Sequence, residues 1–408
     1  MEDVFIVEAA RSPIGKFMGV LSDIDAPHLG AEVVKGMMLR TKIDSSKIDE
    51  VIVGNVISAG IGQNPAKQVV VYSSLSSGIP AFSVNKVCAS GLKAVSLGAE
   101  SISSGNAGMV VAGGIESMSN SPFIIKGIRR LQKFGNVRMD AFLEKAKQNG
   151  IGAERLELVD EMIDAGLLDC YSNLHMGAIA EDLAGRYAVS REEQDEFALG
   201  SHVKAAKAAD DGRFKKEIIP IKTSDGQAVS ADEGIRRDTS MEKLAALKPA
   251  FKEKGNVTAG NSSQLSDGAA FILLMSKAML DESGLKPLAK IESYSSSGID
   301  PSMYGMAPVS AVKKALKKSG MGIEDVDLIE LNEAFCVQAL SVVKALGIDK
   351  EKLNVNGGAT ALGHPIGATG ARILATLAYA LHDYNKDVGI ATLCHGGGGA
   401  MAMVIRRV

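Results

Sequence analysis

Short apolar runs alternate with helical and glycine-rich segments along most of the chain. Each run has the length and composition of a buried strand: VFIVEA (4–9), EVIVGNV (50–56), AGMVVAGG (107–114), DLIELNEA (327–334) and DVGIATLC (387–394). Helical stretches and glycine turns separate them. This order of elements predicts a layered α/β fold.

The pattern changes between residues 121 and 250, where the sequence becomes charged and rich in helix formers. In SREEQDEFALGSHVKAAKAADDG (190–212), Ser190 and Glu193 form a capping-box pattern that marks a helix start. The stretch EIIPIKTSDGQAVSADEGIRRDTS (217–240) reads as extended chain that loops over another part of the molecule. We predict an inserted loop domain at 121–250, an N-terminal core half at 1–120 completed by about 251–275, and a C-terminal core half at 276–408.

The two flanks of the insertion resemble each other in order and spacing, which indicates an internal duplication. KVCASGLKAVSLGAESI (86–102) resembles LGHPIGATGARILATLAYAL (362–381), and GMVVAGGIES (108–117) resembles GIATLCHGGGG (389–399), with Gly113 opposite Cys394. Asn55 precedes Cys88 by 33 residues, and Asn332 precedes His364 by 32 residues. We therefore expect Cys88 and His364 at equivalent positions, each at the N-terminus of a helix.

Packing of the two halves about a pseudo-twofold axis would bring four side chains into one site. A helix N-terminus and a nearby imidazole would give the thiol of Cys88 thiolate character, which suits a nucleophile in acyl transfer. His364 and Asn332 can donate hydrogen bonds to a thioester oxygen, and Cys394, beside the glycines of HGGGG, can act as a base. This set of groups predicts a site for Claisen condensation.

Taken singly, each of these residues has a structural interpretation as well. A buried cysteine is more often a small core residue, and a histidine in a glycine turn is more often structural. The hypothesis depends on all four residues arriving in order at the strand-to-turn junctions of a duplicated unit. Cys170 and Cys336 lack such settings, and we interpret both as structural.

Composition excludes several other classes of protein. The 408 residues carry a formal charge of −3, and no basic run interleaved with aromatic residues suggests a nucleic-acid partner. The four scattered cysteines predict free thiols in a reducing compartment. The opening MEDVFIVEAARSPIGKF enters a strand without a basic leader, and no uncharged apolar stretch approaches the roughly 18 residues of a membrane span. We expect a cytoplasmic protein with no membrane partner.

Six blocks together resemble the thiolase family in its own order over essentially the whole chain. They are GQNPAKQ, NKVCASGLKAV, VTAGNSSQLSDGAA, LNEAF, NGGATALGHPIGATGAR and LCHGGGGA. The resemblance implies a five-layer αβαβα fold of two similar halves, with an inserted loop domain over the coenzyme A site. It also implies a homodimer or homotetramer and a two-step reaction of acyl-CoA substrates.

The resemblance also implies a role for each site residue. Cys88 would carry the acyl group, and His364, with a water held by Asn332, would form one oxyanion hole. Cys394 would exchange the substrate proton, and the backbone N–H groups of Cys88 and Gly396 would form a second oxyanion hole. The positions that match the family's coenzyme A contacts are His175, Met176, Arg236, Ala259 and Ser263. Coenzyme A and acetyl-CoA are expected as substrates, with no tightly bound cofactor and no metal, since Ile235 stands where some members have a potassium-binding tyrosine.

The activity implied is the reversible condensation of two acetyl-CoA to acetoacetyl-CoA and CoA. The alternative is thiolysis of longer 3-ketoacyl-CoA in fatty-acid β-oxidation, and the bulky Tyr304 and Met306 favour the short-chain activity. A ketoacyl synthase is disfavoured because it would lack a cysteine at position 394, and a non-enzymatic coenzyme A binder would not need the cysteines and His364 together. Two departures stand out: the long charged segment 126–156, and His395, which either points away from the site or tunes the pKa of Cys394.

Overall fold

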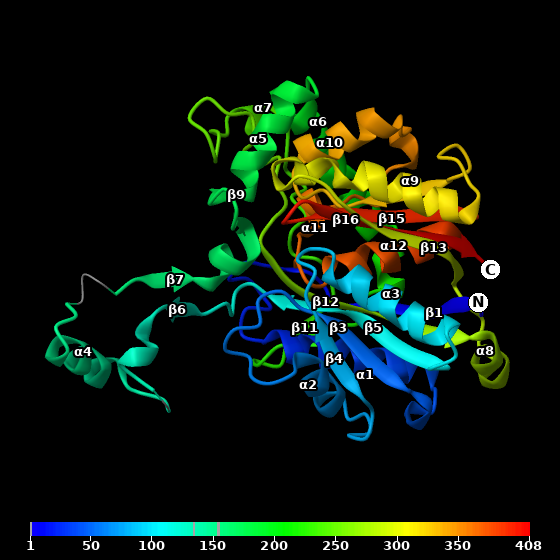
Figure 1. The fold of residues 1–408 in the computed structure, drawn as a ribbon. Coiled ribbons are helices and arrows are strands. Elements are labelled where there is room, and N and C mark those ends of the chain that lie inside the picture. Colours follow the sequence, from blue (N-terminus) through cyan, green and yellow to red (C-terminus); the bar gives the residue numbers. More distant parts are fainter. Residues whose placement is uncertain (1, 134, 153–155) are drawn as a thin grey trace.

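The structure, a computed structural model, describes residues 2–133, 135–152 and 156–408 and places two sheets between three layers of helices (Figure 1). The N-terminal half contains β1 (Val4–Arg11), β2 (Gly15–Lys16), α1 (Ala26–Thr41), η1 (Ser45–Lys47), β3 (Glu50–Gly54), α2 (Pro65–Tyr72), β4 (Ala81–Val84), α3 (Ser90–Ser103), β5 (Met109–Ser117), β12 (Ser266–Ser276) and α8 (Lys277–Ser283). The C-terminal half contains β13 (Ala289–Gly298), η6 (Pro301–Met306), α9 (Ala307–Ser319), β14 (Leu328–Leu331), α10 (Cys336–Leu346), η7 (Lys350–Lys352), α11 (Ala359–Leu362), α12 (Thr369–Asp383), β15 (Val388–His395) and β16 (Gly399–Arg407). The predicted five-layer order is confirmed.

The two sheets have the same strand order and are linked at one edge. Hydrogen bonding follows the order β14-β15-β16-β13-β1-β12-β5-β3-β4. In each half the first strand pairs antiparallel with the last, so that β1-β12-β5-β3 corresponds to β13-β16-β15-β14. The inner pairs β3 with β5 and β14 with β15 are parallel. This shared topology confirms the predicted duplication.

Burial on both faces explains why the strands read as continuous apolar runs. Along β12, Phe271 and Leu273 pack in the outer core with α1, whereas Ile272 and Leu274 pack in the middle core with α3 and α12. Every residue of β12 is buried. The five runs identified in the sequence are β1, β3, β5, β14 and β15, and the structure adds β12, β13 and β16 between them.

The middle helices α3 and α12 touch at their N-terminal ends. A Cβ atom on Gly91 would lie 2.9 Å from the backbone nitrogen of Ala371, and one on Gly370 would lie 2.4 Å from that of Leu92. Only glycine permits so close an approach of two backbones. The contact therefore brings the starts of both helices, and the turns before them, to the centre of the molecule.

The strand register corrects one detail of the predicted duplication. The parallel pairs place Gly54 opposite Gly114 and Leu331 opposite Thr392. Asn55 and Asn332 follow their strands at the same point, so the residue equivalent to Cys394 is Glu116 rather than Gly113. The sequence comparison aligned glycine runs, but the backbone hydrogen bonds of the sheet set the true correspondence.

The segment between the halves contains short elements and two long helices. They are β6 (Phe123–Ile125), η2 (Ile128–Arg130), α4 (Met139–Gln148), β7 (Leu158–Asp160), the π-helix η4 (Met162–Leu167), β8 (Leu168–Asp169), β9 (Leu174–His175), α5 (Met176–Arg186), α6 (Arg191–Asp210), η5 (Arg213–Lys216), β10 (Ile221–Lys222), β11 (Ala228–Val229) and α7 (Met241–Ala245). The predicted capping box is present, with Ser190 and Glu193 each accepting from the other's backbone N–H. Ile219 and Ile221 pack in the outer core beside α1, so this part of the segment lies against the body.

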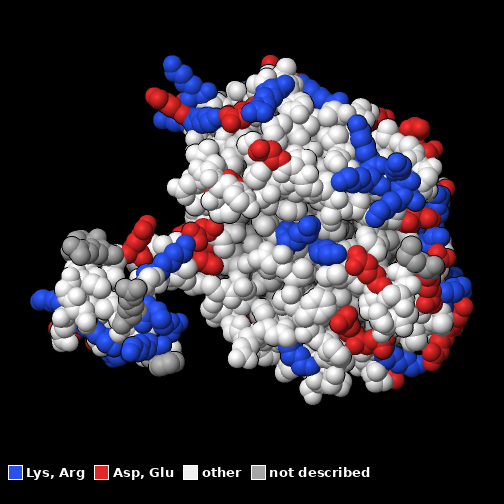
Figure 2. Space-filling view, in the orientation of Figure 1, with Lys and Arg blue, Asp and Glu red and all other residues white. Residues whose placement is uncertain are grey.

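A long arm leaves the body at β6 and returns at β7 (Figure 1). It carries α4 and a small core of its own around Leu131 and Phe142. Basic side chains gather on this arm (Figure 2). The arm contains the charged segment 126–156, of which residues 134 and 153–155 lie outside the described residues. No helix among the described residues is long and apolar enough to cross a membrane.

Candidate active site

Parallel pairing of β14 with β15 places Asn332 and Cys394 at one edge of the C-terminal sheet. Asn332 directly follows β14, and its backbone N–H donates to the carbonyl oxygen of Thr392 at 3.0 Å. Cys394 lies two residues further along β15. Both side chains are buried, and the Oδ1 atom of Asn332 has no hydrogen-bond partner among the described residues. Asn332 thus retains an acceptor at the site.

A strained turn presents Cys88 just before α3. Val87 adopts a φ of 49°, a left-handed conformation that is rare for a β-branched residue. Asn85 accepts from the N–H of Val87 at 2.9 Å, and the Ser90 hydroxyl donates to the carbonyl oxygen of Val87 at 2.6 Å. Backbone strain of this kind persists only where surrounding hydrogen bonds hold it in place, and it is common in functional turns.

His364 is presented by a second turn, before α12. Gly363, with a φ of 111°, precedes it, and a Cβ there would lie 2.2 Å from the Ser266 hydroxyl oxygen. The Nδ1 atom of His364 lies 2.7 Å from the Thr369 hydroxyl, which itself donates to the carbonyl oxygen of Pro365 at 2.9 Å. Because the hydroxyl proton is already used, Nδ1 carries the imidazole proton and donates to Thr369. The Nε2 atom is then an acceptor, 3.4 Å from Nδ2 of Asn332.

Burial favours the neutral forms of both the His364 imidazole and the Cys88 thiol. Burial lowers the pKa of His364 to about 3, with the Arg372 cation acting in the same direction. Burial also raises the pKa of Cys88 to about 12, against the opposing effect of hydrogen bonds from the Gly396 and Cys88 backbones. The thiolate character expected for Cys88 is therefore wrong for the resting site, because desolvation outweighs the stabilising N–H groups.

Cys88 lies close enough to Cys394 to raise the pKa of the Cys394 thiol, and Gly396 lies beside Cys88. Burial, and secondarily Cys88, raises the pKa of Cys394 above its usual range. The Gly396 backbone donates to Cys88, and a Cβ at Gly396 would lie 3.5 Å from Val87 and 3.9 Å from the sulfur of Met176. The backbone N–H groups of Cys88 and Gly396 thus converge on the Cys88 sulfur, where a carbonyl oxygen of a bound acyl group would develop charge.

Tyr304 and Met306 do not share one pocket, although the sequence grouped them. The Tyr304 hydroxyl donates to the carbonyl oxygen of Met176 at 3.1 Å, and burial and both site cysteines raise its pKa. Met306 instead lines a surface hollow beside α9 with Tyr187. The grouping was wrong for Met306 because η6 turns the two side chains to different surroundings.

A cavity of about 450 Å³ leads to His364 and contains most of the predicted coenzyme A contacts. Its lining includes His175, Arg236, Ala259 and Ser263, as the sequence predicted. Met176 does not line it, because its side chain is buried beside Gly396. The volume lies in the range typical of small-molecule sites.

Sequence reasoning missed further residues of this cavity. They are Lys16, Phe17, Met118, Ile163, Leu167, Ala250, Phe251, Ser262, Gln264, Leu265, Phe335 and Ile366. Phe251 stacks on His175 with ring centroids 4.7 Å apart, and meets Phe335 edge-on at 5.9 Å. In the sequence, only the proximity of some of these residues to the blocks LNEAF and TAGNSS pointed to the cavity. The others are apolar residues scattered along the chain, and such residues do not show in advance that they line one cavity.

The remaining candidates lie as follows. His395 follows Cys394 on the strand, so its side chain points to the opposite face, and its Nδ1 lies 2.7 Å from the carbonyl oxygen of Gly396. Cys170 is exposed and Cys336 is buried, 3.5 Å from the Thr360 hydroxyl. Within the described part of the chain, no group of three or more His, Cys, Asp or Glu side chains could hold a metal ion.

Comparisons with known proteins agree over the full chain. Residues 4–278 match the model of the thiolase N-terminal domain, and residues 285–407 match that of the thiolase C-terminal domain. Proteins named acetyl-CoA acetyltransferase are similar: that of Pseudomonas aeruginosa is 46% identical with 100% of both chains covered, and that of Escherichia coli is also 46% identical with 100% of both covered. The crystal structure of the Bacillus anthracis acetyl-CoA acetyltransferase superposes with a TM-score of 0.92 at 39% identity, covering 100% of this chain and 99% of that one.

Proposed function

The chain belongs to the thiolase family, and from this premise we propose that it is an acetyl-CoA C-acetyltransferase. The reaction is the reversible condensation of two acetyl-CoA to acetoacetyl-CoA and CoA. The observation that carries the proposal is His364, which burial keeps neutral and which lines the cavity with Nε2 as an acceptor, together with the proximity of Cys88 and Cys394. Full-length relatives named for the same activity support it and do not favour the longer-chain alternative.

The first half of the reaction transfers an acetyl group to Cys88. The sulfur attacks the thioester carbonyl of acetyl-CoA while its proton passes to Nε2 of His364, because a free thiolate is disfavoured at this buried site. The CoA sulfur leaves with the proton of Cys394, which leaves a thiolate on Cys394, and an acetyl thioester remains on Cys88. The N–H groups of Cys88 and Gly396 stabilise the oxyanion formed on the way.

The second half joins two carbon atoms. The Cys394 thiolate removes a proton from the methyl group of a second acetyl-CoA, and the enolate oxygen is held by His364 and by a water on Asn332. The enolate carbon attacks the acetyl group on Cys88, the bond to sulfur breaks, acetoacetyl-CoA is released, and the Cys88 sulfur regains its proton from His364. Coenzyme A and acetyl-CoA are thus substrates, and the mechanism needs no bound cofactor.

Coenzyme A would occupy the cavity described above. Its apolar walls, with Leu167, Phe251 and Phe335, suit the pantetheine arm, and Lys16 and Arg236 supply positive charge for the phosphates. His202 accepts a hydrogen bond from the Arg236 backbone at 3.1 Å and helps to fix this residue. We also propose a cytoplasmic homodimer or homotetramer; the free state of all four cysteines supports the reducing compartment.

Acetylation of the chain by acetyl-CoA tests the proposal directly. Wild type should gain one acetyl group on the Cys88 peptide by mass spectrometry and cleave acetoacetyl-CoA faster than a medium-chain 3-ketoacyl-CoA. Cys88→Ala should lose both activities, whereas Cys170→Ala, at an exposed cysteine, should keep them. A wild-type protein that cleaves neither substrate, or prefers the medium chain, would overturn the proposal.

A further inference from the structure

The segment that carries His364, residues 357–369, is held on both sides of the histidine by buried carboxylates from opposite halves of the molecule. Glu333 accepts from the backbone N–H of Thr360 at 3.0 Å, and Glu116 accepts from that of Gly367 at 2.9 Å. The exposed fractions of Glu333 and Glu116 are 1% and 0%. We propose that these two side chains, here called the carboxylate clamp, are positioning residues that hold His364 in register with Cys88 and Asn332; this inference rests on the proposed function.

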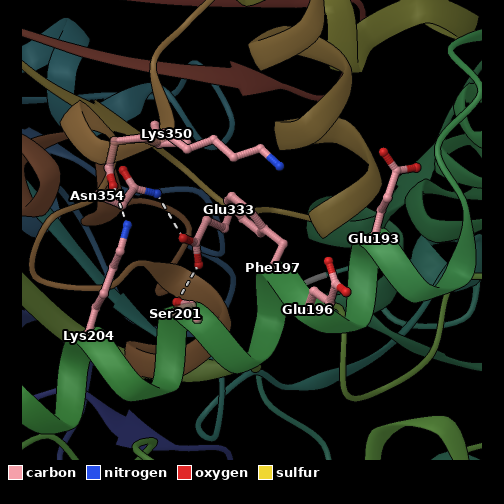
Figure 3. A pocket seen from close by; sticks show the side chains of 10 residues that line it. Glu193, Glu196, Phe197, Ser201, Lys204, Glu333, Lys350 and Asn354 are labelled. Carbon is pink, nitrogen blue, oxygen red and sulfur yellow. Dashed lines mark hydrogen bonds between the residues drawn. The ribbon is translucent and has the colours of Figure 1, made fainter. Parts of the chain in front are cut away.

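Glu333 connects the His364 segment to the inserted segment and to Asn332, its neighbour in the chain. Figure 3 shows its two oxygens reaching Ser201 on α6 and Asn354. The Ser201 hydroxyl donates to Oε2 at 2.8 Å and accepts from the backbone N–H of Gly358 at 3.0 Å. The Asn354 amide donates to Oε1 at 2.8 Å. One carboxylate thus ties α6, Asn354 and the start of the His364 segment to the residue that follows Asn332.

Glu116 makes the corresponding connection on the Cys88 side. Its Oε1 accepts from the Asn55 amide at 2.8 Å and from the N–H of Ile57 at 3.1 Å, while Oε2 accepts from the N–H of Val56 at 3.2 Å. Val56 and Ile57 pack in one cluster with Ile366 and Cys88. The turn after β3 and the turn after His364 are therefore tied to one side chain, with the nucleophile packed against both.

The chemistry of these contacts requires a carboxylate. All four groups around Glu116 are hydrogen-bond donors. A glutamine there would place its own NH₂ group where one carboxylate oxygen now accepts, so that two donors would face each other. The same holds at Glu333, because the Asn354 amide is locked by hydrogen bonds of 2.9 Å to both the N–H and the carbonyl oxygen of Leu331. A glutamine at either position keeps the shape but pushes one segment away.

The test compares Glu116→Gln and Glu333→Gln with a matched control at the far end of the sheet. Asp327 also accepts from two backbone N–H groups, those of Asp387 and Val388, each at 3.0 Å, at the start of β15. Asp327→Asn therefore makes the same carboxylate-to-amide change at a side chain that accepts from backbone N–H groups away from His364. Assays run at pH 8, since burial raises the pKa of Glu116 to about 7 and the carboxylate must be ionised.

Both clamp variants should lose about 10- to 100-fold in kcat for acetoacetyl-CoA cleavage with KM nearly unchanged, because a displacement of about 1 Å has that cost. The rate of Cys88 alkylation by iodoacetamide should fall, with its pH profile displaced to higher pH. Asp327→Asn should keep wild-type kcat and alkylation, because both backbone N–H groups there bind one oxygen, Oδ2, which an asparagine can also supply. Ser201→Ala removes a single hydroxyl group, which donates to Glu333 and accepts from Gly358. It should show a weaker form of the same loss and serves if the glutamine variants do not fold.

Wild-type kcat and alkylation profiles in Glu116→Gln, Glu333→Gln and Ser201→Ala would overturn the clamp even if melting temperatures fall. A control variant that loses kcat as strongly as the clamp variants would do the same, since a general loss of stability would then explain both. Failure of the proposed function is a separate outcome, visible as a wild-type protein that does not cleave acetoacetyl-CoA. If wild type does not cleave acetoacetyl-CoA, the alkylation rates still test the carboxylate clamp, because alkylation of Cys88 needs no substrate.

Discussion

Tyr304 is the residue whose surroundings bear most directly on substrate size. Its hydroxyl is bonded to Met176, and its pKa responds to Cys88 and Cys394. The ring of Tyr304 is buried, and we expect it to limit the room for an acyl chain beyond an acetyl or acetoacetyl group.

Tyr304→Ala should raise the ratio of kcat/KM for 3-ketohexanoyl-CoA over that for acetoacetyl-CoA by about 10-fold, since each added methylene in a fitted pocket is worth 10-fold or more. The matched control is Met306→Ala, which also truncates a buried residue of η6 but faces the hollow beside α9. Steady-state rates on both substrates decide the matter. An unchanged ratio in Tyr304→Ala would show that another part of the cavity sets chain length.

Residue types alone predicted Cys88, His364, Asn332 and Cys394, but not their ionisation states. The contacts of His364 and its burial depend on where the chain folds, and they make it a neutral acceptor with a pKa of about 3. The roles of Glu116 and Glu333 were invisible, because a single glutamate at a strand end looks like any surface charge. Their function follows from the donors that the fold brings to them.

At the scale of elements, the contact between α3 and α12 determines whether the two turns can form one site. Glycines at the crossing let the helices touch backbone to backbone. Which residues meet depends on how the two halves dock.

Gly91→Ala should lower both stability and kcat, because its Cβ would lie 2.9 Å from the backbone atoms Ala371 N and Gly367 O, which cannot move aside. We expect a loss of about 1–3 kcal/mol in the free energy of unfolding. Gly200→Ala, within α6, meets nothing within 4 Å and should gain about 0.5–1 kcal/mol. Urea unfolding and acetoacetyl-CoA cleavage measure the two effects, and wild-type kcat in Gly91→Ala would contradict the role of this contact.

At the scale of the whole molecule, the arm between β6 and β7 exposes apolar side chains that no contact within one chain accounts for. Phe123 and Leu158, in its two paired strands, are 63% and 58% exposed. Exposed apolar side chains on a projecting ribbon favour contact with another protein surface. A second copy of this chain is the partner consistent with a homotetramer, one of the two assemblies proposed above.

Replacing both Phe123 and Leu158 with serine should reduce the mass measured by light scattering from a tetramer to a dimer. Activity per chain should persist, because neither residue lines the cavity or touches the site residues. Leu39→Ser, at a residue of α1 that is 78% exposed, provides the control and should leave the mass unchanged. A double variant with the wild-type mass would show that the arm does not form the contact between copies of the chain.

The sequence by itself predicted five of the strands, the duplication and four candidate site residues, because apolar period and residue order are local properties of the chain. Only the tertiary structure showed that Cys394 and Glu116 occupy equivalent positions in the two halves. It alone also decided the different surroundings of Tyr304 and Met306 and the neutral state of Cys88 and His364. Each of these depends on hydrogen-bond register, side-chain direction or desolvation. Those quantities arise only when segments far apart in the sequence are packed together.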